Sequence, residues 1–139
     1  MKIFIRSLFF SGIVLLSTGC STSPGHYLDA YYGQPNRLKG SWVYADPQNG
    51  SVVLTFHKDC TFELDGDGDG KKDIGGTYEL FENRVTFKEE YPQQMTQCTQ
   101  WGYYNYAVEH AKLNFTVMAD QCDPRELVLS QPFVRLKNK

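Results

Sequence analysis

Apolar and polar residues alternate along most of the chain from Gly40 onward. A period of two is typical of antiparallel strands that bury one face and leave the other in water. No segment of this region has a convincing helical period. The alternation predicts strands at residues 40–45, 51–57, 60–64, 76–81, 84–88, 102–109, 112–118 and 126–136. The domain is therefore expected to be all-β, with eight strands, or nine if Pro132 divides the last one.

The links between these strands fall into two classes, short and long. Tight links join the second strand to the third, the fourth to the fifth and the sixth to the seventh, at residues 58–59, 82–83 and 110–111. The other links are longer. In an up-and-down arrangement alternate connections lie at the same end of the sheet. We therefore expect a small antiparallel barrel with tight turns at a closed base and all four long loops at an open mouth.

Aromatic residues make up 14% of the chain, and alternation directs many of them inward. Tyr104 and Tyr106 share one face of their strand, and Tyr103 lies on the other. An eight-stranded barrel is either just filled by side chains or holds one small ligand. The predicted inward rings are Phe56, Phe62, Tyr78, Phe87 and Phe115. Rings of this size could fill the barrel or line a cavity, and the pattern leaves both open.

A different pattern occupies the first twenty residues. Lys2 and Arg6 are followed by an apolar run at 8–16 and then by small residues up to Cys20. The apolar run is too short to span a bilayer and is typical of a signal peptide. We therefore expect residues 1–19 to be removed on export, residues 20–39 to form a tether, and residues 40–137 to form the folded domain.

Residues 16–20, with the sequence LSTGC, resemble the lipobox of bacterial lipoproteins. Leu16 lies one residue further from Cys20 than the usual lipobox leucine, and Ser17 takes its place. The resemblance implies cleavage before Cys20 and acylation of that cysteine; the alternative is an ordinary secretory signal that is cleaved elsewhere. In enterobacterial-type lipoproteins a serine after the cysteine permits transfer to the outer membrane. Ser21 therefore implies lipid anchoring in the bacterial cell envelope, at the outer rather than the inner membrane.

Charge and motifs narrow the function classes. Without Lys2 and Arg6, the 120 residues that follow the signal carry 12 basic and 16 acidic side chains, a balance of −4. This balance argues against a nucleic-acid partner, which requires a basic stripe. The chain also has none of the common hydrolase, metalloprotease, P-loop or dinucleotide-binding motifs. We therefore expect a binding protein rather than an enzyme, with no catalytic residues.

Short motifs at both ends of the predicted domain resemble those of lipocalin-like (calycin) barrels. Gly40-Ser41-Trp42 is similar to the G-x-W motif of the first strand, and residues 55–63 are similar to a bacterial hairpin motif with Cys60 in place of a glycine. The resemblance implies that Arg135 packs over Trp42 at the base, and it covers about residues 38–137. The alternative is an unrelated small β-sandwich or barrel.

The acidic segment at residues 65–73 has the strongest chemical pattern. Its spacing, D-x-D-x-D-G-x-x-D, resembles the first nine positions of an EF-hand loop, and such oxygen donors suit Ca²⁺. Gly76 stands where an EF-hand has its bidentate glutamate, so we expect weak binding, with Kd about 10⁻⁴–10⁻³ M. The alternative is a solvated hairpin tip without an ion. The candidate ligands are the carboxylates of Asp65, Asp67, Asp69 and Asp73 and the backbone carbonyl of Lys71.

The predicted topology also pairs the cysteines. Cys98 and Cys122 lie in two long loops at the mouth, whereas Cys60 lies at the base. An oxidising envelope favours disulfide formation. We therefore expect a Cys98–Cys122 disulfide and a free, buried thiol at Cys60. The three histidines are isolated and do not have the spacing of zinc ligands.

Two function hypotheses follow. The first is a membrane-anchored lipocalin-like barrel that binds a small apolar ligand and has a calcium-ordered loop at its mouth. The second is a structural or protein-interaction lipoprotein, including an inhibitor of another enzyme, with a filled barrel and no small ligand. Interior volume distinguishes the two.

Overall fold

The computed structural model describes residues 37–48, 50–91 and 98–137. The predicted signal peptide, Cys20 and Ser21 lie outside this part of the chain.

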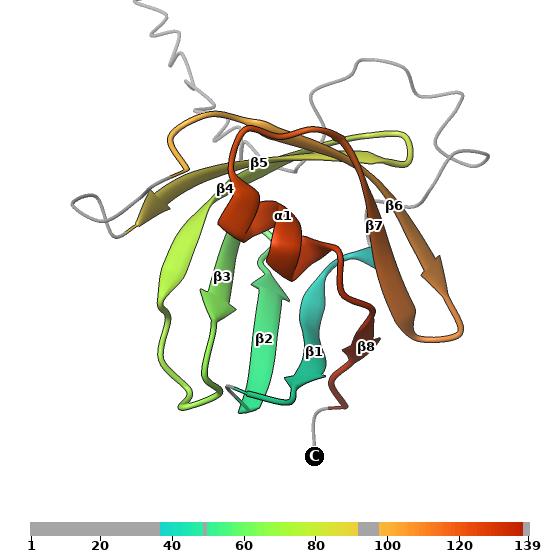
Figure 1. The fold of residues 1–139 in the computed structure, drawn as a ribbon. Coiled ribbons are helices and arrows are strands. Elements are labelled where there is room, and N and C mark those ends of the chain that lie inside the picture. The colour runs from blue at the N-terminus through green and yellow to red at the C-terminus, as the bar shows by residue number, and fades with distance from the viewer. Residues whose placement is uncertain (1–36, 49, 92–97, 138–139) are drawn as a thin grey trace, which may run out of the picture.

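Eight antiparallel strands form a closed barrel in which each strand pairs with the next and β8 returns to β1 (Figure 1). The all-β up-and-down barrel expected from the sequence is confirmed. Because every neighbouring pair is antiparallel, the β1–β2, β3–β4, β5–β6 and β7–β8 connections share one rim, the mouth, and the other three share the opposite rim, the base. The expected division into long and tight links holds only in part, because the β1–β2 link has three residues (47–49) and the β2–β3 link has four (57–60). The strands are β1 (Gly40–Asp46), β2 (Gly50–Phe56), β3 (Thr61–Asp65), β4 (Ile74–Phe81), β5 (Arg84–Tyr91), β6 (Gly102–Glu109), β7 (Lys112–Ala119) and β8 (Phe133–Arg135).

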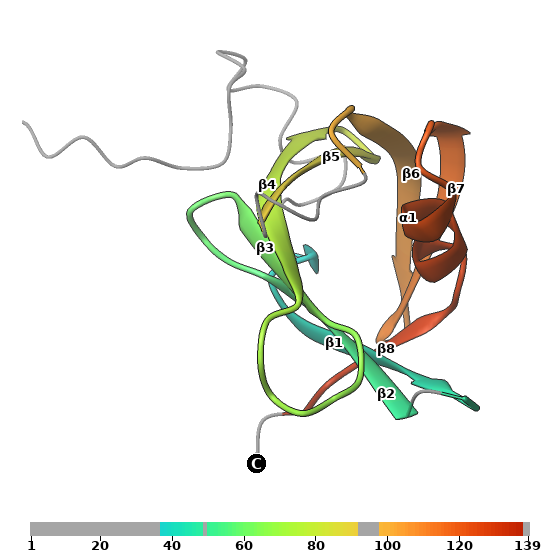
Figure 2. The same cartoon turned by 60° about the vertical axis from the view of Figure 1, so that its left-hand side comes forward.

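The prediction of a last strand at residues 126–136, with no helix in the domain, is wrong. Residues Asp123–Leu129 form the helix α1, and β8 contains only three residues. Pro124 lies in the first turn, where its missing N–H costs nothing. Leu127 is 68% exposed and Leu129 is 4% exposed, so residues two apart lie on opposite sides, as in a helix. In both views α1 lies next to β7 (Figure 1, Figure 2).

The barrel interior is filled around one ring. Phe87 of β5 contacts Phe56 of β2 and Phe62 of β3, with ring centroids 5.9 and 5.2 Å apart. On the opposite side it contacts Tyr104 of β6 and Phe115 of β7, each with centroids 5.8 Å apart. These rings meet mostly edge to face, the arrangement that aromatic quadrupoles favour. Rings from five strands therefore meet inside the barrel, whose strands are drawn in Figure 2.

The tight turns at the base adopt left-handed backbone conformations without glycine. His110 and Ala111 have φ angles of +47° and +65°, and Glu82 has a φ of +57°. Two consecutive positive φ values match the right-handed twist of a two-residue hairpin. The β6–β7 turn thus has the geometry of a type I′ hairpin with residues that adopt it only under strain.

Candidate functional site

The acidic segment forms the β3–β4 loop at the mouth. The loop is closed by the pairing of Leu64 with Ile74 and by a 2.9 Å hydrogen bond from the Asp73 N–H to the Leu64 carbonyl. Carboxylate oxygens of Asp65, Asp67 and Asp73 all lie within 4.8 Å of one another. The loop therefore brings together three of the four carboxylates that the spacing predicted.

Backbone N–H groups hold these carboxylates in place. Asp65 accepts hydrogen bonds from Gly68 at 2.7 Å and Gly70 at 2.8 Å, and Asp73 accepts one from Gly66 at 2.7 Å. Gly68 and Gly70 have φ angles of +76° and +87°, which side chains rarely permit. The glycines thus allow the loop to curl around its own acidic groups, and the converging hard oxygen donors fit a Ca²⁺ ion.

Asp69 lies outside this group. Its Oδ2 is 2.8 Å from the Lys71 Nζ, and its other oxygen accepts a hydrogen bond from the Lys71 N–H. These hydrogen bonds from Lys71 lower the pKa of Asp69. Glu63, on the neighbouring strand β3, does not join the cluster either, because its carboxylate lies 3.3 Å from His57 Nε2 and 3.5 Å from Lys72 Nζ. The cluster is therefore smaller than the sequence pattern suggested.

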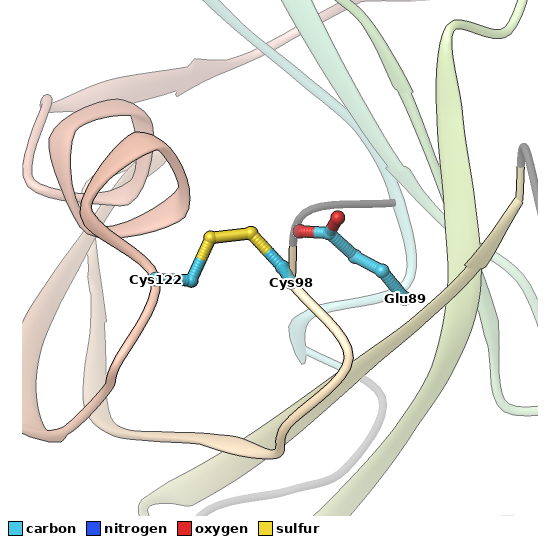
Figure 3. A group of neighbouring side chains, drawn as sticks. All are labelled: Glu89, Cys98 and Cys122. Carbon is cyan, nitrogen blue, oxygen red and sulfur yellow. A yellow bond between two sulfur atoms is a disulfide. The ribbon is translucent and has the colours of Figure 1, made fainter. Parts of the chain in front are cut away.

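A disulfide joins two other mouth segments. Cys98, before β6, is bonded to Cys122, before α1, with Cα atoms 5.3 Å apart, and this pairing is confirmed (Figure 3). Figure 3 also shows Glu89 beside the bridge, but disulfide sulfurs are not the thiolate ligands that metals require.

The prediction of a free, buried thiol at Cys60 is wrong. Cys60 lies in the β2–β3 turn with a φ of +67°, where it is half-buried and disulfide-bonded.

A buried ion pair beside this disulfide was not anticipated from the sequence. The Arg125 Nε and Nη2 atoms each lie 2.7 Å from a carboxylate oxygen of Asp120, and Nη2 also donates to the Gln100 carbonyl at 3.0 Å. Asp120 accepts further hydrogen bonds from the Tyr104 hydroxyl and the Cys122 N–H. Arg125 thereby fastens α1 to both segments that the disulfide joins.

The two carboxylates near Arg125, Asp120 and Glu89, have pKa values shifted in opposite directions. Burial pushes the pKa of Asp120 upward, but hydrogen bonds from Arg125 and Tyr104 outweigh it and leave that pKa below its usual range. Burial raises the pKa of Glu89, and the nearby Arg125 charge opposes this only in part. Glu89 Oε1 lies 3.8 Å from Arg125 Nη1, too far for a hydrogen bond. Glu89 is thus the weakly held carboxylate of the group.

At the base, the structure brings Trp42 and Arg135 together. The Trp42 indole N–H donates to the Leu38 carbonyl at 2.7 Å, and the ring is fully buried. The Arg135 guanidinium lies over this ring and donates to the backbone carbonyls of Lys39 and Arg37. This is the arrangement that the resemblance to lipocalin-like barrels implied for the two residues.

Comparisons with protein-family models, curated proteins and solved structures returned no match to the chain. Within the described residues, no helix has the length and apolar character needed to cross a bilayer.

Proposed function

We propose that this protein is a lipid-anchored lipoprotein of the bacterial cell envelope whose side-chain-filled barrel acts by contacting another protein. The ring contacts of Phe87 are the observation that supports protein contact over binding of a small apolar ligand. Its ring touches rings from β2, β3, β6 and β7, so it spans the interior where a small apolar ligand would lie. The filled interior favours the protein-contact hypothesis over the apolar-ligand hypothesis.

The arrangement of the barrel supports an orientation for such a protein. The chain enters β1 at the base, beside the Trp42–Arg135 pair, and the acidic loop and the disulfide lie at the opposite rim. Acylation of Cys20 would therefore hold the base near the membrane and present the mouth away from it.

A calcium ion at the acidic loop is part of this proposal. Asp65, Asp67 and Asp73 would supply the carboxylates, and the ion would neutralise their mutual repulsion. A millimolar Ca²⁺ titration should raise the melting temperature of the protein, and Asp65→Asn or Asp73→Asn should abolish the increase. Asp69→Asn is the matched control and should retain most of it, because Asp69 is paired with Lys71. An unchanged melting temperature at millimolar Ca²⁺ would eliminate the site.

The filled interior is tested by ligand retention. Native mass spectrometry of protein purified from its own host should show no co-purifying lipid beyond covalently attached chains. Phe87→Ala is the positive control, because removing the central ring creates an apolar cavity that should take up a small apolar probe such as benzene. A stoichiometric noncovalent lipid on the unmodified protein would restore the apolar-ligand hypothesis.

The anchor is tested by labelling cells with an alkyne-bearing palmitate analogue. The protein should incorporate label, and Cys20→Ser should abolish incorporation. Besides Cys98 and Cys122, which are bonded to each other, the sequence has two cysteines, Cys20 and Cys60, and Cys60 is disulfide-bonded. A sulfur that carries lipid cannot also form a disulfide, so the intact mass of the exported protein before and after reduction distinguishes an acylated Cys20 from a Cys20–Cys60 disulfide. A Cys20–Cys60 disulfide in the exported protein would refute the anchor. Ser21→Asp should retain the labelled protein in the inner membrane of an enterobacterial host. Unlabelled protein of the uncleaved mass would refute the anchor.

A further inference from the structure

The barrel closes through a very short strand. β8 pairs with β7 only at Lys112 and Leu113, and with β1 only at Trp42 and Val43. Residues 114–119 of β7 therefore have a strand partner on the β6 side alone within the described part of the chain. We call this stretch the β7 edge.

The β7 edge presents unpaired backbone groups. Glu109 and Lys112 flank the two-residue turn and form a hydrogen-bonded pair, so the alternation of an antiparallel ladder directs the backbone of Asn114 and Thr116 to β6. The N–H and C=O groups of Phe115 and Val117 then point to the opposite side. No turn or loop hydrogen bond between described residues reaches them.

The composition of the β7 edge favours pairing with another strand. Between Lys112 and Asp120 the sequence is LNFTVMA, which has no charge and no proline. Val117 is 40% exposed and Met118 is 50% exposed. Native edge strands are usually protected by charges, proline or cover, and an exposed apolar edge is a template for an added strand. α1 contacts β7 and Phe115 is only 8% exposed, so the exposed part of the β7 edge is residues 116–119.

We infer that the β7 edge binds an extended segment of a partner protein, which adds to the barrel as a strand beside α1. The inference deepens the proposed function and rests on it, since it names the mode of contact. Strand addition takes its affinity from main-chain hydrogen bonds and its selectivity from alternate side chains. The exposed Val117 and Met118 would contact apolar side chains of the partner segment.

Charge indicates the chemistry at one end of that segment. α1 carries Asp123 and Glu126 in its first turn and no basic residue in its last turn. Its only cation, Arg125, is buried against Asp120. A partner segment with lysine or arginine at its α1-facing end therefore complements this surface.

A second copy of the chain fits the β7 edge less well. Antiparallel pairing of two β7 strands about a two-fold axis requires the two barrels to point in opposite directions. Two molecules anchored through their bases to one membrane point in the same direction. A separate extended partner has no such restriction.

The test uses the exported mature protein, ¹⁵N-labelled in dodecyl maltoside micelles, and a synthetic peptide of alternating valine and threonine with two terminal lysines. Addition of the peptide should shift the amide signals of Phe115 and Val117 and slow their hydrogen exchange at least tenfold. A peptide with proline at alternate positions should have no effect, because proline cannot donate to a ladder. Val117→Lys should weaken binding at least tenfold. Ala107→Lys adds the same charge at an exposed position of β6, the strand on the other side of β7 from the β7 edge, and should leave binding unchanged.

Three results would overturn the inference. In the free protein, the Phe115 and Val117 amides could already exchange as slowly as those of Asn114 and Thr116, which would mean that the edge is covered. The lysine-bearing peptide could leave both amides unaffected. Protection could instead appear with increasing protein concentration alone, which would identify a second copy as the occupant. None of these results bears on whether the barrel interior is filled, which native mass spectrometry tests separately.

Discussion

The guanidinium carbon of Arg135 lies 4.1 Å from the centroid of the Trp42 ring, and the same two residues are paired across β8 and β1. Arg135 also donates to the Lys39 carbonyl at 2.8 Å and to the Arg37 carbonyl. One side chain therefore binds the end of the last strand to the segment that enters the first. It helps to close the barrel where β8 and β1 pair at only two positions.

Replacing Arg135 should destabilise the barrel. Arg135→Ala removes a cation–π contact and two charge-assisted hydrogen bonds, with an expected loss of about 2–4 kcal/mol in the free energy of unfolding. Arg135→Lys keeps the charge but lacks the planar fork, and should recover less than half of the loss. Urea unfolding measures both. Lys137→Ala, two residues further on and exposed, is the control and should change stability by less than about 0.5 kcal/mol. Full recovery by lysine would show that charge alone matters.

Asp120→Asn should be among the most damaging single substitutions. The substitution leaves the buried Arg125 charge with neutral hydrogen-bond partners and with Glu89 3.8 Å away. Breaking a buried ion pair in this way costs about 3–5 kcal/mol in the free energy of unfolding. The depressed pKa of Asp120 means that its stabilisation is present above the unfolded value of 3.8 and is lost as pH falls through the lower folded value. Denaturant unfolding should therefore show a large difference between variant and parent at pH 7 that shrinks in strong acid. In an Arg125→Met background the same substitution should cost much less. An equal cost in both backgrounds would contradict the ion-pair account.

Glu89→Gln should have the opposite pH dependence. Burial raises the folded pKa of Glu89 above its ordinary value of 4.5, so ionisation of the carboxylate opposes folding. This penalty is absent below pH 4.5, grows as pH rises toward the folded pKa, and is complete above it. The variant should therefore gain stability relative to the parent between pH 4.5 and 7, as measured by urea midpoints across that range. Glu90→Gln, the exposed neighbour, is the control. A variant whose advantage is greatest in acid would reverse the assignment.

Ala111→Gly should stabilise the protein. Ala111 has a φ of +65°, and a left-handed conformation costs an alanine about 1–2 kcal/mol that glycine does not incur. The greater freedom of glycine in the unfolded chain offsets part of this gain, leaving about 0.5–1 kcal/mol. Thermal unfolding should show a higher melting temperature. Ala107→Gly, at a regular strand position of β6, should lower the melting temperature instead. A decrease for both would mean that the turn is unstrained.

The sequence was sufficient to predict the barrel because its strands bury one face each. In β2, for example, Leu54 and Phe56 are buried, as alternation indicates, and each strand then pairs with the next one along the chain. Alternation failed at α1. Leu127 and Leu129 have strand-like spacing, and over seven residues the helical period is too brief to be distinguished from it. The start signal was Asp123-Pro124, which local chemistry favours at a helix N-terminus.

The candidate site was predicted unevenly for related reasons. The acidic loop is contiguous, so its spacing was sufficient to indicate convergence of Asp65, Asp67 and Asp73. Local spacing did not indicate that Asp69 pairs with Lys71, which depends on side-chain conformation. The Arg125–Asp120 pair could be recognised only once α1 was known, because the helix directs the guanidinium inward. The disulfide followed from topology because both cysteines belong to the same rim.

The three-residue β8 has a consequence for the order in which the protein can form. Contacts between β8 and β1 join residues more than ninety positions apart, with Trp42 paired to Arg135. Contacts of such long range form late, because closing so large a loop costs entropy before any pairing offsets it. β1 therefore keeps one side without its strand partner until β8 is available. Under the proposed export, a chain that crosses a membrane unfolded and amino terminus first would complete its barrel only after β8 had emerged.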